Sequence, residues 1–311
     1  MVVFTRELFS VSAEVQQALD ARRAVVALES TVIAHGLPRP MNLETARHLE
    51  DTVRAHGAAP ATIAVLRGRI HVGLSDEELR HIAESGAIRK LSRRDLPIAI
   101  ARQWDGATTV AATVWVAGQM GIEVFATGGI GGVHRGALPD VSADLPELAR
   151  TFVTVVCSGA KIVLDLAATR EWLETHGVTV LGYGCDEMPA FYSQSSGLPV
   201  DLRVDSPADV AAIARARREL NLAGAVLVTV PVPSDSEVPA HKLQALLDEA
   251  LAEAQQAGVG GRDLTPFLLA RMARASSGAT LRANIALLEN NARVAAEIAA
   301  ALGKDRRDTE G

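Results

Sequence analysis

Residues 123–157 read EVFATGGIGGVHRGALPDVSADLPELARTFVTVVC. The stretch opens on one apolar run, Glu123–Ala126, and closes on another, Val153–Cys157, and both have the length and composition of buried strands. Between them Ser142 precedes a short apolar and acidic segment, a pattern that predicts the N-cap of a helix. Because parallel strands need such helical crossovers, this stretch predicts one strand–helix–strand unit of a parallel sheet.

The same alternation continues outward along the chain. Strands are predicted at Val25–Glu29, Thr62–Leu66, Ile70–Val72, Val178–Gly182, Leu202–Val204 and Gly224–Val230, with Arg67-Gly68-Arg69 turning between the second and the third. Helices are predicted to begin after the caps Ser75 and Ser206 and to cover about His241–Ala257, Thr265–Arg274 and Leu281–Leu302. The pattern predicts a single α/β domain over residues 1–303, with a largely parallel sheet covered on both faces, and a polar, frayed tail over residues 304–311.

Composition excludes several classes of protein. The 311 residues are 48% hydrophobic and 22% charged, which suffices for a large core and excludes wholesale disorder. No apolar run approaches the ~20 residues of a membrane span, and the N-terminus lacks a secretory pattern. A net charge of −6 and 4% aromatic residues disfavour nucleic-acid binding. With only Cys157 and Cys185 available for disulfides, we expect a cytoplasmic protein whose partner is a small molecule, with no nucleic acid and no membrane.

Polar residues follow several predicted strands, at the edge where α/β proteins bind ligands. Glu29 ends an apolar run, where burial would raise its pKa and suit a general acid; a helix cap or a structural ion pair is the alternative. Residues 127–132 read TGGIGG, which is either a tight turn or a cradle for a small phosphate. This stretch is no dinucleotide fingerprint, because His134 holds the place of the third glycine.

Two further strand ends carry charged groups. Asp140, Ser142 and Asp144 alternate and could converge on one hard cation or on one anion, which is compatible with Ser142 capping a helix. Lys161 lies between a buried strand and an apolar segment that we expect to start a helix; it either extends to the surface or is a desolvated nucleophile. Only four of the 31 basic residues are lysines, and a lysine, unlike an arginine, can lose its proton. Lys90 is read as a solvated surface charge or as a clamp on phosphate.

The chain resembles the pseudouridine-5′-phosphate glycosidases, a family that includes proteins named for indigoidine biosynthesis. The resemblance covers residues 6–302, and the connection 136–140 is shorter than in some members. It is carried by eight motifs: Leu28-Glu-Ser-Thr-Val-Ile-Ala-His-Gly-Leu-Pro, Lys90-Leu-Ser-Arg-Arg-Asp-Leu-Pro, Gly106-Ala-Thr-Thr-Val-Ala-Ala-Thr, Thr127-Gly-Gly-Ile-Gly-Gly-Val-His-Arg-Gly, Asp140-Val-Ser-Ala-Asp-Leu, Val155-Val-Cys-Ser-Gly-Ala-Lys, Thr265-Pro-Phe-Leu-Leu-Ala-Arg and Asn284-Ile-Ala-Leu-Leu-Glu-Asn-Asn.

The resemblance implies a three-layer α/β/α sandwich, a homotrimer, and reversible cleavage of the C–C bond between uracil and ribose 5-phosphate through a lysine Schiff base with the ring-opened sugar. It implies that Lys161 is the nucleophile, that Glu29 is the proton donor and that Asp140 binds Mn²⁺. The substrate contacts that it implies are Lys90, Val110, Ser142, Ala143 and Asp144, with Thr127, His134 and Asn284 lining the same pocket.

Two other functions remain open from the sequence. A Schiff-base aldolase or isomerase acting on another sugar phosphate would use the same lysine, glutamate and phosphate site. A non-catalytic nucleotide-binding accessory protein would bind the ligand without consuming it. Composition and spacing alone predict a cytoplasmic α/β enzyme that acts on a phosphorylated small molecule.

Overall fold

The computed structural model describes residues 8–135, 140–259 and 264–309. Their centre is an 11-stranded, largely parallel sheet in the order β1-β4-β3-β2-β7-β9-β13-β11-β12, with β6 beside β3 and β5 beside β6. From β3 through β12 this path is parallel throughout, and the pairs β3–β4 and β3–β6 are antiparallel. The strands are β1 (Phe9–Val11), β2 (Val25–Glu29), β3 (Ala59–Leu66), β4 (Arg69–Val72), β5 (Arg89–Leu91), β6 (Gly106–Thr108), β7 (Val124–Ala126), β9 (Thr154–Cys157), β11 (Thr179–Tyr183), β12 (Leu202–Val204) and β13 (Val226–Thr229).

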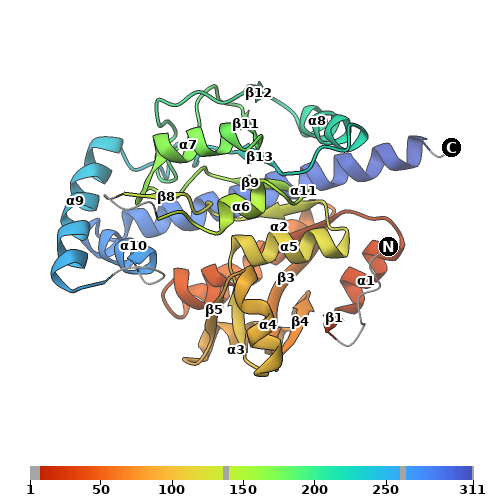
Figure 1. Cartoon of the computed structure of the whole chain (residues 1–311), viewed down its shortest axis with the longest axis horizontal. Coiled ribbons are helices and arrows are strands. Elements are labelled where there is room, and N and C mark those ends of the chain that lie inside the picture. Colours follow the sequence, from red (N-terminus) through yellow and green to blue (C-terminus); the bar gives the residue numbers. More distant parts are fainter. Residues whose placement is uncertain (1–7, 136–139, 260–263, 310–311) are drawn as a thin grey trace.

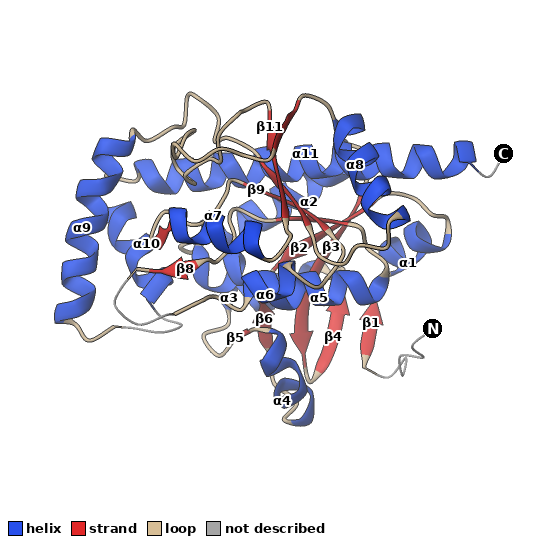
Figure 2. Cartoon of the chain, turned by 45° about the horizontal axis from the view of Figure 1, so that its top comes forward, coloured by secondary structure: helices blue, strands red, loops and turns tan. Residues whose placement is uncertain are grey.

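Helices cover both faces of the sheet, as Figures 1 and 2 show. One face packs against α2 (Met41–Ala55), α8 (Pro207–Glu219) and the long α11 (Ala279–Thr309), and the other against α5 (Val110–Met120), α6 (Asp144–Leu148) and α7 (Leu166–Thr175). The pair α9 (Ala240–Gln256) and α10 (Leu264–Ala275) lies at one end of α11. The remaining described helices are α1 (Ala13–Asp20), α3 (Asp76–Glu84), α4 (Leu96–Ala101), the π-helix η1 (Val32–Gly36) and the 3₁₀ turn η2 (Arg93–Asp95). The predicted three-layer α/β/α sandwich is confirmed.

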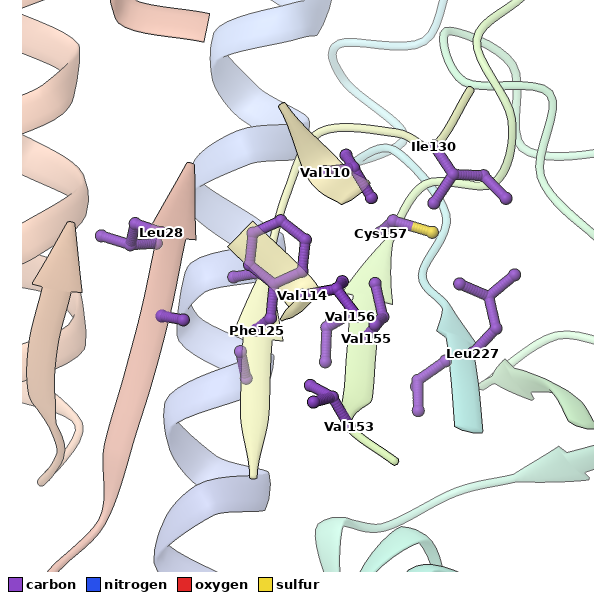
Figure 3. Packing of buried hydrophobic residues seen from close by; sticks show 14 of the residues in the cluster. Leu28, Val110, Val114, Phe125, Ile130, Val153, Val155, Val156, Cys157 and Leu227 are labelled. Atoms are coloured by element: carbon purple, nitrogen blue, oxygen red, sulfur yellow. The ribbon is translucent and has the colours of Figure 1, made fainter. Parts of the chain in front are cut away.

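The central strands are buried on both faces, which explains their unbroken apolar sequences. Every residue of β2, β7 and β9 is buried. Figure 3 shows Phe125 of β7 and Val155 of β9 packed near Val110 and Val114 of α5. Burial of these strands against two helical layers holds their carboxyl ends in fixed relative positions. None of the described helices combines the length and the apolar character that a bilayer span requires.

Most predicted elements are confirmed to within a few residues. The predicted hairpin forms between β3 and β4, and Ser75 and Ser206 each complete a capping box at the start of α3 and α8. The elements that the sequence did not indicate include five strands of two or three residues each, namely β1, β5, β6 and the small antiparallel pair β8 (Val133–His134) and β10 (Leu164–Asp165). Strands this short show no readable period.

Three local predictions are wrong. No helix starts directly after Lys161: a turn and β10 intervene, and α7 begins only at Leu166. The N-cap of α6 is Ala143 and not Ser142. The Ser142 hydroxyl still accepts a hydrogen bond, at 3.3 Å, from the N–H of Asp144, the first residue of the helix. The last helix extends to Thr309, well past the predicted end at Leu302. The domain boundary at residue 303 stays a prediction, and residues 310–311 of the tail lie outside the described residues.

Candidate active site

Three adjacent parallel strands bring the main candidates to one edge of the sheet. β2 ends at Glu29, β7 ends one residue before Thr127, and β9 ends four residues before Lys161. β7 pairs with β2 on one side and with β9 on the other. The carboxyl ends of these strands therefore meet, as expected for a ligand site in an α/β sheet.

Two adjoining cavities occupy this edge. A small one, of about 60 Å³, lies among η1, the residues after β7 and α10. A larger one, of about 290 Å³, extends toward the start of α5 and the residues before α6. Both cavities share a boundary made by five residues: Glu29, Thr31, Lys90, Lys161 and Thr265.

The structure brings all of the predicted site residues together around these cavities. Glu29, Lys90 and Lys161 line both. Thr127 and Asn284 line the smaller one. The larger one is lined by Val110, His134, Asp140, Ser142, Ala143 and Asp144. Their chemical roles stay predictions at this point.

Glu29 is a buried carboxyl, 6% exposed, on the shared boundary. The Thr127 hydroxyl donates a hydrogen bond to its Oε1. Burial raises the pKa of Glu29 above its usual range, and the charge of Lys161, the bond from Thr127 and the charge of Lys90 oppose that rise only in part. A carboxyl that keeps its proton at higher pH than usual can act as a general acid, as the sequence led us to expect.

Lys161 is anchored through its backbone and is half-buried. Its N–H donates to Ile130 O at 3.1 Å, and its carbonyl accepts from Leu164 N at 3.0 Å. Because Lys161 lines both cavities and is not fully buried, its side chain can be reached from either of them.

The glycine-rich stretch 127–132 is shaped by close packing. A Cβ on Gly129 would lie 2.7 Å from Phe191, and one on Gly131 would lie 2.2 Å from the Ser142 hydroxyl. The N–H groups of Thr127, Ile130 and Gly131 already donate to Val156 O, Gly159 O and the Asp144 carboxylate. These three N–H groups are not available to a phosphate, so the predicted phosphate cradle is wrong for half of the stretch, and close backbone approach explains its glycines.

Asp144 joins the two sides of the larger cavity. Its Oδ1 accepts from Ala111 N at 2.9 Å, in the first turn of α5, and its Oδ2 accepts from Gly131 N at 2.8 Å. The side chain is 6% exposed. Because both carboxylate oxygens are bonded to backbone, the structure favours a role for Asp144 in holding the cavity wall.

Sequence reasoning did not assign several residues that line the cavities. The larger cavity includes Ser92, Arg94 and Thr109, and the smaller one includes His35 and Phe191. The first four lie inside the motifs of the family resemblance, so proximity to a motif could have found them. Phe191 has no such signal: it reaches the cavity from a distant loop and adopts φ of 63°, a strained value for an aromatic residue.

The donor set around Asp140 defines what metal it could hold. Asp140 is exposed on the wall of the larger cavity, and residues 136–139 before it lie outside the described residues. Within the parts of the chain that the structure describes, no three His, Cys, Asp or Glu side chains converge on one point. One carboxylate, completed by water and phosphate oxygens, is a fitting set for a hard divalent cation such as Mn²⁺.

Comparison with known proteins gives one consistent result. Residues 14–301 match the family model described as "Indigoidine synthase A like protein". The chain is 55% identical to a pseudouridine-5′-phosphate glycosidase of Solibacter usitatus over 92% of this chain and 96% of that protein. It is 50% identical to one of Escherichia coli over 94% and 95%.

Solved structures agree. The prealnumycin C-glycosynthase AlnA, solved in complex with ribulose 5-phosphate, superposes with a TM-score of 0.89 at 42% identity, over 97% of this chain and 99% of that one. An indigoidine synthase A-like protein of Thermotoga maritima superposes with a TM-score of 0.88 at 38% identity, over 95% and 97%. The chain belongs to the indigoidine synthase A like family.

Proposed function

We propose that this protein reversibly cleaves the C–C glycosidic bond of pseudouridine 5′-phosphate, with uptake of water, to give uracil and ribose 5-phosphate. The observation that carries the proposal is the shared boundary of the two cavities: Lys161 and the buried Glu29 both line it, and the charge of Lys161 acts on the Glu29 carboxyl. The names of relatives at 50–55% identity support the same activity. A related structure solved with ribulose 5-phosphate supports a phosphorylated sugar in this site.

A lysine suits this reaction because the scissile bond offers no heteroatom to protonate. Glu29 would protonate the ring oxygen of the ribose as the C1′–O4′ bond breaks, and the Lys161 amine would bond to C1′. The ammonium formed in this way would return a proton to the Glu29 carboxylate. The nitrogen lone pair would then expel uracil while that proton passes to C5, which leaves an iminium between Lys161 and C1′. Water would hydrolyse the iminium, releasing ribose 5-phosphate and restoring the amine. The carboxylate pair of ordinary glycosidases is not required.

The two cavities would divide the substrate between them. The larger one offers the cations Lys90 and Arg94 and the start of α5 at Val110, which favour the 5′-phosphate. The hydroxyls of Ser92, Thr109 and Ser142 line the same space, with His134 and Ala143 beside them.

The smaller cavity would take the uracil ring. Asn284 is 5% exposed there, and its Oδ1 has no hydrogen-bond partner among the described residues. A buried acceptor without a donor costs free energy, which an N–H of uracil would recover.

Three further features belong to the proposal. Asp140 would hold Mn²⁺, which when bound supplies positive charge beside the phosphate. We also propose a homotrimer, from the family resemblance, and a cytoplasmic location, because two cysteines cannot form a disulfide framework.

Replacement of Lys161 tests the proposal. Lys161→Ala and Lys161→Arg should both abolish uracil release from pseudouridine 5′-phosphate, because neither can form an imine. Borohydride should attach a pentose phosphate to wild-type protein at residue 161 and to neither variant, as read by mass spectrometry. An arginine variant with near-normal turnover would exclude the Schiff base. Wild-type protein that releases no uracil but converts simple sugar phosphates would point to the aldolase or isomerase instead.

A further inference from the structure

Asn291 is a fully buried amide that lies behind the site. It is 0% exposed and lies on α11, seven residues after Asn284. Seven residues are two helical turns, so both side chains project from the same face of α11. Asn284 lines the smaller cavity, whereas Asn291 lines neither cavity. It therefore touches no substrate bound there.

The side chain of Asn291 connects the chain segments that follow β7 and β9. Its Nδ2 donates to Thr127 O at 2.9 Å and to Gly128 O at 3.4 Å, both just after β7. The same nitrogen lies 3.1 Å from the hydroxyl of Ser158, the residue after β9, and that hydroxyl donates to Asn291 Oδ1 at 3.3 Å. Ser158 N also donates to Gly128 O at 2.9 Å. One amide thus ties the two segments to α11 and to each other.

Each tied segment carries a reacting group or its direct partner. Thr127 donates its hydroxyl hydrogen bond to Glu29. Ser158 lies three residues before Lys161, in the connection between β9 and β10. Loss of the amide would remove the donor to the Thr127 carbonyl and to the Ser158 hydroxyl, while Gly128 O would keep only its bond from Ser158 N, so both segments would relax toward other partners. The distance between the carboxyl and the amine would then no longer be defined.

We propose that Asn291 is a positioning residue that holds the segments after β7 and β9 in the relation that lets Glu29 and Lys161 act on one substrate. The inference rests on the proposed function, because it presumes that these two groups react. It adds a residue outside the cavities to the reaction's machinery.

Kinetics of Asn291 variants test this role. Asn291→Leu removes both hydrogen-bonding functions at similar volume, and Asn291→Asp presents an acceptor to the Thr127 and Gly128 carbonyls. Both should lower kcat for pseudouridine 5′-phosphate about 10- to 100-fold, because small misplacement of reacting groups carries a cost of that order. KM should stay within about threefold, because no contact to substrate is removed. Borohydride trapping at Lys161 should slow in parallel.

Asn290→Leu is the matched control. Asn290 is the neighbouring residue of α11, half-buried, and its amide contacts Pro231 O at 3.4 Å and the Arg293 side chain, away from both segments. The control should lose some thermal stability yet keep wild-type kcat at a temperature well below its midpoint. If Asn291→Leu does not fold, Ser158→Ala carries the comparison, because it removes the other half of the same hydrogen-bonded pair. Folded variants at Asn291 or Ser158 with wild-type kcat would overturn the proposal, as would an equal loss in Asn290→Leu.

The pH profile separates positioning from general damage. Lys161, Lys90, Asp144, His35 and the Thr127 hydroxyl surround Glu29. The bond from Thr127 stabilises the ionised form, so a displaced Thr127 should move the limb of the kcat profile that Glu29 controls to higher pH in Asn291→Leu. An unmoved limb would contradict the proposal. If wild-type protein released no uracil, the proposed function itself would fail, whereas active wild-type protein with unaffected variants would exclude only the role of Asn291.

Discussion

At the residue scale, charged side chains in and beside the larger cavity differ in whether they already have partners within the protein. Both carboxylate oxygens of Asp144 accept hydrogen bonds from backbone N–H groups. Arg93 is bonded to the buried Glu147 at 3.1 Å. Arg94, the next residue, has a side chain that is 76% exposed, and among the described residues its ion pair is a long one, 3.9 Å, with Asp95. Arg94 is therefore the arginine of this run that can turn to an incoming phosphate.

Arg94→Gln should weaken binding of the phosphate. An exposed ion pair contributes about 0.2–1 kcal/mol, so KM for pseudouridine 5′-phosphate should rise about 1.4- to fivefold with kcat little changed. The effect should shrink as salt is added, because exposed charges are screened. Steady-state kinetics at two ionic strengths provide the measurement. Arg102→Gln, an exposed arginine that lines neither cavity, is the control, and the same KM change for the unphosphorylated nucleoside would contradict the assignment.

At the scale of elements, the site is built from segments that extend the sheet beyond its strands. Past β7 and β9 the chain continues to pair, through Ser158 N to Gly128 O and Ile130 N to Gly159 O. The π-helix η1 follows β2 and is supported by Asn42, whose amide donates to Ile33 O and Ala83 O at 2.9 Å each. A π-helix is rare and often marks a functional site. These contacts hold irregular backbone in place at the cavity wall.

Gly131→Ala should disrupt this arrangement. The added methyl would lie 2.2 Å from the Ser142 hydroxyl and 2.7 Å from Asp144 Oδ2, so the wall must shift. Overpacking of this kind costs about 1–3 kcal/mol of stability, and we expect kcat to fall as well. Chemical denaturation and uracil release provide the two measurements. Gly86→Ala is the control, because its methyl would meet nothing within 4 Å. Equal stability of the two variants would show that the stretch tolerates a side chain.

At the scale of the whole molecule, the buried carboxyls affect how stability depends on pH. Burial raises the pKa of Glu29 and of Glu50 in the folded protein. The folded state therefore holds these protons at pH values where the unfolded chain has lost them. The stabilisation is complete below the unfolded glutamate pKa of about 4.3 and is lost as pH rises through the folded value.

Glu29→Gln should separate stability from activity. The amide stays neutral at every pH, and its oxygen can still accept from Thr127, so the variant should gain stability over wild type as pH rises above about 4.3, up to a plateau. Its kcat should fall about 10²- to 10⁴-fold because no proton donor remains. Thermal midpoints between pH 4 and pH 8, measured in parallel with uracil release, provide the comparison. A stability difference that stays constant with pH would show that folding does not raise the pKa of Glu29.

Local patterns explain what could be predicted. Val25–Glu29 and Leu202–Val204 form as expected because an unbroken or alternating apolar run depends only on near neighbours. The caps at Ser75 and Ser206 are equally local. The family motifs then pointed to eleven site residues, and the fold places all of them around one pair of cavities. Glu29 and Lys161 could be recognised because each is a charged group at the end of an apolar strand.

The sequence by itself thus determined which functional groups lie at the ends of which strands: an acid at the end of one strand, glycines after the next and a lysine after the third. Only the tertiary structure decided that Asp144 and Asn291 serve the backbone, that Arg94 faces the larger cavity, and that Lys161 is half-buried. The physical reason is that a hydrogen-bonding group has no assigned partner until distant segments pack together. The partner, and not the residue type, then decides whether the group holds the wall or meets the substrate.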